Sequence, residues 1–114
     1  MGYMTKKEEI YWYDISANKK LTESFIREHA DEINWTEICI AQTLSENFMR
    51  EFADRINWRL VSINQRMTQK FINEKVNELD IFELDFSHYL SQDFKVRYKD
   101  KFDTIVKIIK GNIK

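Results

Sequence analysis

The residues best placed for chemistry in this 114-residue chain are carboxylates that recur 23 positions apart. Glu28 and Asp31 are followed at that interval by Glu51 and Asp54, and Glu32 adjoins the first pair. If these segments are helices stacked side by side, the five carboxylates align in one acidic ridge. Such a ridge can imitate a phosphate backbone or bind a basic partner by electrostatic complementarity. We expect the acidic ridge to bind a partner, although solvated helix faces carry similar charges.

Basic residues gather near the C-terminus instead. Residues 1–94 hold 11 Lys and Arg against 17 Asp and Glu, whereas residues 95–114 hold 7 against 2, within a net charge of −1. The basic segment consists of Lys95, Arg97, Lys99 and Lys101. With Tyr98 among them, these residues are suited to contact phosphates or RNA. The same charges would equally suit a solubilising cap at the negative pole of a last helix.

Nucleophilic, metal-assisted and phosphate-loop chemistry find no support in the sequence. Cys39 is the only cysteine, which excludes an internal disulfide, and the two histidines, His29 and His88, are too far apart in sequence for a zinc motif. The chain has two glycines, Gly2 and Gly111, and no proline. That composition removes glycine-rich phosphate loops, dinucleotide fingerprints and nucleophile elbows. We therefore expect no enzyme activity, no cofactor and no metal.

An internal repeat positions these side chains. A motif of an apolar residue, Ser or Thr, Glu or Gln, any residue and Phe recurs at the same interval as the carboxylates, beginning at Leu21, Leu44, Met67 and Leu90. Residues 12–34 and 35–57 share eleven identical positions. The sequence thus divides into four repeats within a single domain of residues 1–114. The repeats are residues 12–34, 35–57, 58–80 and 81–103.

Each repeat contains two helix-capping signals and therefore predicts two short helices. Asn or Asp precedes the first helix at Asn34, Asn57, Asp80 and Asp103, and Ser or Thr precedes the second at Thr22, Ser45, Thr68 and Ser91. Helices this short are marginal alone, so neighbouring repeats must bury a shared face. We predict an all-α fold, either a short α-solenoid or a compact bundle of four 23-residue helix-hairpin repeats. Residues 2–11 and 104–114 are the expected caps, and the second of these is a helix.

The second helix of the repeat is amphipathic over residues 46–56. Phe48, Met49, Phe52 and Ile56 fall at helical spacing, and charged residues occupy the other side. The same pattern places a phenylalanine at the centre of every second helix. This core column is Phe25, Phe48, Phe71 and Phe94.

Three further positions have both a structural and a functional interpretation. Trp12, Trp35 and Trp58 recur at the repeat period, which indicates core residues, with stacking on bases or on a partner as the alternative. His29 fills a position that other repeats give to aromatic residues or lysine, and we expect it to be partly exposed at the end of the array. Cys39 matches serines one repeat away on either side, which indicates a small residue at a close helix contact.

The best copies of the repeat resemble a known family. Ile33-Asn34-Trp35-Thr-Glu-Ile38, followed by Leu44-Ser-Glu-Asn-Phe-Met-Arg-Glu-Phe52, resembles the short helical repeats of uncharacterised proteins from tailed phages and giant DNA viruses. The resemblance covers about residues 12–103. It weakens in the fourth repeat, where Ile81 replaces the tryptophan and Arg97 the glutamate. The resemblance implies a helical repeat and a viral or mobile-element source, and it supplies no catalytic residue.

Together these features predict a non-enzymatic macromolecular interaction module. We expect a phage-encoded inhibitor that binds a host defence protein or nucleoprotein, of CRISPR or restriction type, through the acidic ridge. The alternatives are a nucleic-acid-binding protein that uses the basic segment, and a structural protein that self-associates, for instance as a homodimer. The sequence contains no run of about 18 apolar residues, and its start lacks the apolar core of a signal peptide. We therefore predict no membrane association and a location in the cytoplasm, which is the cytoplasm of the host cell if the protein is viral.

Overall fold

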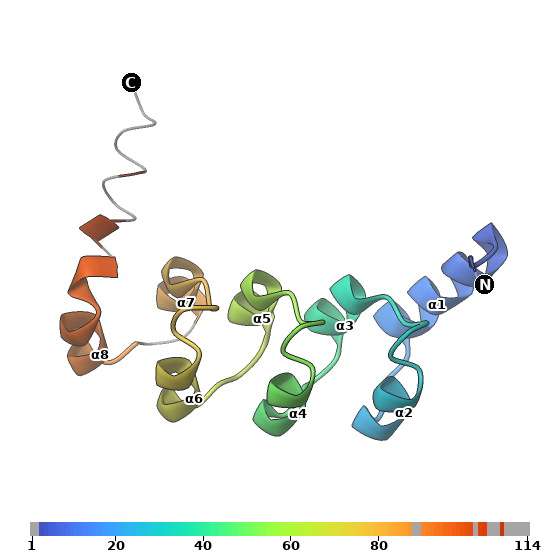
Figure 1. Ribbon diagram of the computed structural model, residues 1–114, viewed down its shortest axis with the longest axis horizontal. Helices are drawn as coiled ribbons and strands as arrows, with labels where there is room; N and C mark the ends of the chain where they lie inside the picture. The colour runs from blue at the N-terminus through green and yellow to red at the C-terminus, as the bar shows by residue number, and fades with distance from the viewer. Residues whose placement is uncertain (1–2, 88–89, 102, 105–107, 109–114) are drawn as a thin grey trace.

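Two layers of short helices make up the protein. The computed structural model describes residues 3–87, 90–101, 103, 104 and 108, and within them it contains helices and no strand. Odd-numbered helices form one layer and even-numbered helices the other (Figure 1). The odd-numbered helices are α1 (Lys6–Asn18), α3 (Trp35–Ala41), α5 (Trp58–Asn64) and α7 (Ile81–Ser87). The even-numbered helices are α2 (Glu23–Glu28), α4 (Glu46–Glu51), α6 (Gln69–Glu74) and α8 (Gln92–Arg97). The all-α prediction and the two helices per repeat are confirmed.

Side-chain caps begin these helices where the sequence places them. Asn34 Oδ1 accepts a hydrogen bond from the backbone N–H of Glu37 at 3.0 Å, and Asp80 Oδ1 accepts from Glu83 at 3.0 Å. In the other layer, Ser45 Oγ accepts from the N–H of Phe48 at 3.1 Å. Each cap satisfies a donor that the first helical turn leaves free, so every repeat restarts its helices at the same register.

The N-terminal segment is not a separate cap. Thr5 and Glu8 form a capping box, and α1 then continues without interruption to Asn18. Residues 6–11, which the sequence assigned to a cap, are therefore the first half of α1. This helix has 13 residues, whereas α3, α5 and α7 have seven each.

The second helix of each repeat is shorter than its hydrophobic pattern suggests. The spacing of Phe48, Phe52 and Ile56 predicted a helix through residue 56, but α4 ends at Glu51. The next residues form a tight turn in which the N–H groups of Arg55 and Ile56 both donate to the carbonyl of Phe52, at 2.9 and 3.0 Å. This turn returns Ile56 to the buried side, which is why a helical period persists beyond the helix.

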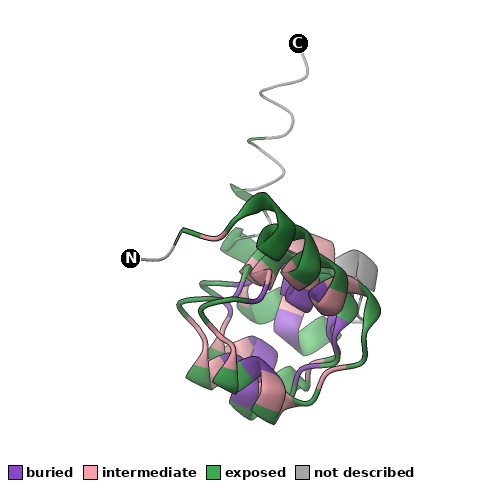
Figure 2. Cartoon of the chain, turned by 90° about the vertical axis from the view of Figure 1, so that its right-hand side faces the viewer, coloured by how far each residue is buried: buried purple, intermediate pink, exposed green. Residues whose placement is uncertain are grey.

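The core lies between the two layers, where Figure 2 shows the buried residues. Phe48, Phe71 and Phe94 are 1%, 0% and 3% exposed, which confirms the predicted phenylalanine column. Phe25 is only half-buried, because it belongs to the first repeat and has a neighbouring repeat on one side.

The C-terminal cap departs from the predicted register. Asp103 was expected to precede a helix, but residues 99–101, 103 and 104 are already helical. The side chain of Asp103 instead accepts a hydrogen bond from Lys99 Nζ at 2.5 Å. Most of the predicted capping segment 104–114 lies outside the described residues.

The two layers are held together along the array in different ways. In the odd-numbered layer, α1 packs against α3, α3 against α5, and α5 against α7. The even-numbered helices stand further apart (Figure 1), and long side chains connect them.

Candidate interaction surface

Two buried glutamines, Gln42 and Gln65, connect consecutive repeats, and neither was predicted from the sequence. Gln65 Nε2 donates to the carbonyls of Cys39 and Gln42, at 3.0 and 2.6 Å, and its Oε1 accepts from the N–H of Leu44 at 3.0 Å. Gln42 makes the same three kinds of bond to the first repeat, with Ser16, Lys19 and Leu21. Each glutamine thus satisfies the C-terminal end of the preceding odd-numbered helix. Their recurrence at the repeat period was the available signal.

A second buried position links the repeats through a small side chain. Ser16 Oγ accepts from the N–H of Asn34 and Ser62 Oγ from that of Asp80, both at 3.0 Å. Cys39 is fully buried in the same position, and the N–H of Asn57 is hydrogen-bonded to its thiol. Burial raises the pKa of the Cys39 thiol, with a smaller opposing effect of that N–H. The prediction of a small residue at a close contact is confirmed, and a raised pKa argues against a reactive thiolate.

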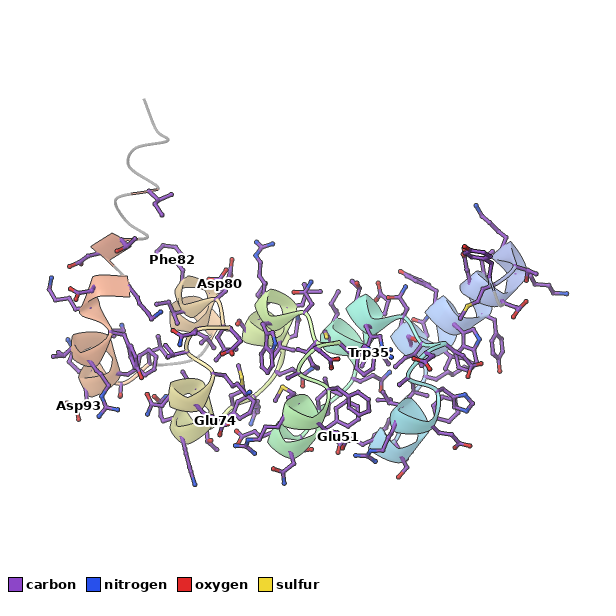
Figure 3. All side chains as sticks on the ribbon, viewed as in Figure 1. Trp35, Glu51, Glu74, Asp80, Phe82 and Asp93 are labelled. Carbon is purple, nitrogen blue, oxygen red and sulfur yellow. The ribbon has the colours of Figure 1, made fainter. Side chains whose placement is uncertain are left out.

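The tryptophans pack against the core and are satisfied within their own repeats. The indole N–H of Trp35 donates to the carbonyl of Ala30 at 2.9 Å, and that of Trp58 to Ala53 at 3.0 Å. Trp35 lies between the layers (Figure 3), with the ring of Phe52 at 5.3 Å from its own. These contacts support the structural interpretation over base stacking.

His29 occupies the position equivalent to Phe52 at the N-terminal end of the array. Its ring lies 5.1 Å from that of Trp12 and 4.5 Å from that of Phe25, and Nδ1 lies 3.0 Å from a carboxylate oxygen of Glu32. The residue is half-buried, so the predicted partial exposure is confirmed.

Arginine–glutamate pairs span the even-numbered helices. Arg27 of α2 donates two hydrogen bonds to Glu51 of α4, at 2.8 and 2.9 Å, and Arg50 of α4 makes the same bidentate pair with Glu74 of α6. The glutamates lie between neighbouring even-numbered helices (Figure 3). Hydrogen bonding to the arginines lowers the pKa of Glu51 and Glu74. Each arginine also lies over the phenylalanine of the following repeat.

A second set of inter-repeat bonds joins carboxylates to helix starts. Glu23 accepts hydrogen bonds from the N–H and hydroxyl of Ser45, at 2.6 and 2.9 Å. Glu46 accepts from Thr68 in the same way, at 2.6 and 3.1 Å. These bonds leave little freedom for the even-numbered helices to move independently.

The acidic ridge is therefore crossed by basic side chains. Glu51 is paired with Arg27, Asp31 Oδ1 accepts from Arg55 at 2.5 Å, and Glu32 lies against His29. Glu28 and Asp54 are exposed, and the described part of the chain offers neither of them a hydrogen bond or ion pair. The ridge exists as an alignment, but three of its five carboxylates also hold the protein together.

Further carboxylates extend this edge. Each turn from an even-numbered helix to the next odd-numbered one follows a carboxylate or contains one, and Glu74 and Glu78 continue the series into the third repeat. Glu78 takes the position in the third repeat that Arg55 takes in the second, so an exposed carboxylate replaces an arginine there. We call residues 28–32, 51–55 and 74–78 the turn edge.

The basic segment is less available than its sequence suggests. Lys101 Nζ donates to Asn77 Oδ1 at 2.8 Å, and Lys99 is bound by Asp103. Lys95 takes the position that Ile26 and Met49 occupy in the core. Arg97 remains exposed on α8. At least two of the four residues thus have structural partners.

No group of three or more His, Cys, Asp or Glu side chains within the described residues could hold a metal ion. None of the helices that these residues form is both long and apolar enough to cross a membrane.

The fold and its inter-repeat bonds define a helical-repeat protein. The carboxylates of its turn edge lie at helix ends and in turns. No protein family, curated protein or solved structure matches the chain.

Proposed function

We propose that the protein is a non-enzymatic binding module whose turn edge recognises a basic surface of another macromolecule. The observation that carries this proposal is the row of exposed carboxylates left over after the internal ion pairs are made. Glu28, Asp54 and Glu78 supply one such carboxylate to each of the first three turns. Among the described residues none of these three carboxylates accepts an inter-repeat hydrogen bond, so a partner can bind them without breaking one, although Asp54 also attracts Arg55.

The rigidity of the array supports the same proposal. Glutamine and arginine bonds fix the first three repeats to one another, and Ser62 bonds the third repeat to the fourth, so the exposed carboxylates are held at set positions before any partner arrives. A preorganised surface loses little conformational freedom on binding. A rigid edge of exposed negative charge also resembles the row of charges that a phosphate backbone presents to a protein.

The specific target that we propose is a nucleic-acid-handling protein of host defence, as a CRISPR or restriction complex would be. Such a protein has a basic channel that must stay open to bind nucleic acid. A rigid acidic edge that occupied the channel would inhibit the complex by competition. The viral resemblance of the repeat is the reason to begin with this class of target.

The test is a pull-down from nuclease-treated host lysate with two matched variants. Asp54→Lys with Glu78→Lys reverses two exposed carboxylates on the turn edge and leaves every inter-repeat bond in place. Glu9→Lys with Asp93→Lys makes the same change of net charge at exposed positions outside the turn edge. We expect the first variant to lose a host protein that the wild type and the second variant both retain.

Two outcomes would contradict the proposal. Equal loss in both variants would show that net charge alone governs capture. Capture that nuclease abolishes and that the turn-edge variant retains would instead favour nucleic-acid binding by Arg97 and the rest of the basic segment, with a steep dependence on salt.

A further inference from the structure

The arginines that connect the even-numbered helices each occupy a binding site with two parts. Arg27 binds the carboxylate of Glu51, and its guanidinium lies 5.6 Å from the ring centre of Phe48. Arg50 binds Glu74 and lies 4.9 Å from the ring centre of Phe71. The arginine site therefore consists of a phenylalanine ring and a carboxylate three positions later, both on the following even-numbered helix. Charge-assisted bonding and the cation–π contact favour arginine at both positions.

The first repeat has the same arginine site, but no arginine occupies it. Phe25 and Glu28 stand on α2 at the positions that Phe48 and Glu51 take one repeat later. Phe25 keeps the ring contacts that Phe48 makes inside its own repeat, with a tryptophan at 6.4 Å and with the aromatic ring four positions later at 4.5 Å. It is nevertheless half-buried, whereas Phe48 and Phe71 are buried. Glu28 is exposed and makes no ion pair with the described residues.

The C-terminal end of the array does not provide the matching arginine. In the fourth repeat, Val96 takes the position of Arg27 and Arg50 and is 68% exposed. Lys95 precedes it, where Ile26 and Met49 are fully buried. A charged residue in a core position and the missing arginine make this end unsuited to stack on Phe25 and Glu28. A second copy of the chain is therefore not the expected occupant.

We propose that Phe25 and Glu28 form an end face that binds an arginine presented on a helix of a partner protein. The internal interfaces define the chemistry of that helix: an apolar residue followed directly by arginine, as in Ile26-Arg27 and Met49-Arg50. The apolar residue covers core side chains of the end repeat, and the arginine binds the carboxylate over the aromatic ring. This surface shares Glu28 with the turn edge, but it requires neither Asp54 nor Glu78.

The test supplies such a helix on a protein of known fold. The donor is the full chain with Lys95→Ile and Val96→Arg, which restores the internal pattern at its C-terminal end, and with Glu28→Arg, which prevents it from binding itself. The receptor is the wild-type chain, labelled for detection in sedimentation velocity. We expect a one-to-one complex, and no complex when unmodified chain replaces the donor. Circular dichroism and thermal unfolding establish that the donor is folded.

Changes to the receptor separate the end face from general adhesion. Glu28→Gln keeps the shape and removes the charge, and we expect it to weaken binding by roughly tenfold, as loss of a charge-assisted pair does. A receptor with Glu28→Arg should not bind the donor, but should bind a chain with Lys95→Ile and Val96→Glu, because the charges are exchanged. A folded donor that forms no complex would overturn the proposal, as would binding that is indifferent to Glu28. Asp54 and Glu78 are unchanged throughout, so this result is independent of the turn-edge test.

Discussion

Replacing Gln65 by methionine should destabilise the junction between the second and third repeats more than any surface change. Methionine fills nearly the same volume but forms none of the three hydrogen bonds that Gln65 makes to the carbonyls of Cys39 and Gln42 and the N–H of Leu44. Gln65 is 4% exposed, so water cannot replace those bonds without opening the interface.

The expected magnitude follows from the groups left unpaired. A buried polar group without a partner costs about 1–3 kcal/mol, and the substitution leaves two carbonyls and one N–H unpaired. Burial of the methionine side chain offsets part of that cost. We therefore expect the free energy of unfolding to fall by about 3–6 kcal/mol. Small domains have roughly 5–15 kcal/mol of stability in all. At about 4 °C per kcal/mol, the melting temperature should fall by roughly 12–24 °C.

The measurement is urea unfolding followed by circular dichroism, with amide hydrogen exchange to locate the effect. Leu44 should lose protection more than amides of the first repeat, because its N–H has lost its acceptor. The matched control is Asn64→Met, a similar change at the preceding position, where the side chain is exposed and makes one bond to the carbonyl of Leu60. A loss below about 1 kcal/mol for Gln65→Met, or one no larger than the control's, would refute the reasoning.

Three further predictions address the other inter-repeat contacts. Cys39→Ser should leave the free energy of unfolding within about 1 kcal/mol of wild type, whereas Cys39→Val leaves a buried N–H unpaired and should cost about 1–3 kcal/mol, both by urea unfolding. Glu51→Gln should be less stable than wild type at pH 7. The hydrogen bond from Arg27 lowers the pKa of Glu51 in the folded protein, so the ionised carboxylate stabilises the fold above its unfolded pKa. This stabilisation is lost as pH falls through the lower folded pKa. The difference in unfolding free energy between wild type and variant should therefore disappear below about pH 4. Asn73→Arg combined with Arg97→Glu should raise the urea midpoint, because it extends the arginine–glutamate pairs to the fourth repeat, and neither single change should do so to the same extent.

Much of the fold could be predicted because repetition and capping are local signals. Asn34 and Ser45 mark helix starts through bonds to residues three positions later, and a constant repeat period forces equivalent positions into equivalent surroundings. The end of α4 could not be predicted in the same way. A tight turn returns Ile56 to the core with the spacing that a continuing helix would give, so the hydrophobic pattern is the same for both.

The candidate site was harder to predict because its contacts join residues that are not one repeat apart. Arg27 binds Glu51, 24 residues later, so comparing equivalent positions shows the two residue types recurring without showing that they meet. The glutamines were visible at the repeat spacing, but a glutamine in a polar stretch gives no sign of burial. The sequence alignment of the carboxylates therefore does not tell which of them are paired. The side-chain positions in the structure do.

The inter-repeat bonds also give the array a direction. Arg27 and Arg50 extend towards the C-terminal neighbour, so the first and second repeats each use an acceptor carboxylate from the repeat that follows. The donor position holds Asn73 in the third repeat and Val96 in the fourth, so the arginine–glutamate pairs end at the third repeat. The first repeat keeps its acceptor, Glu28, although an isolated array would be no less stable with a neutral residue there. The fourth repeat thus offers no arginine for stacking at that position, whereas Phe25 and Glu28 keep the acceptor side of the internal contact. This difference between the two ends of the array is the reason to seek an arginine-bearing partner at α2.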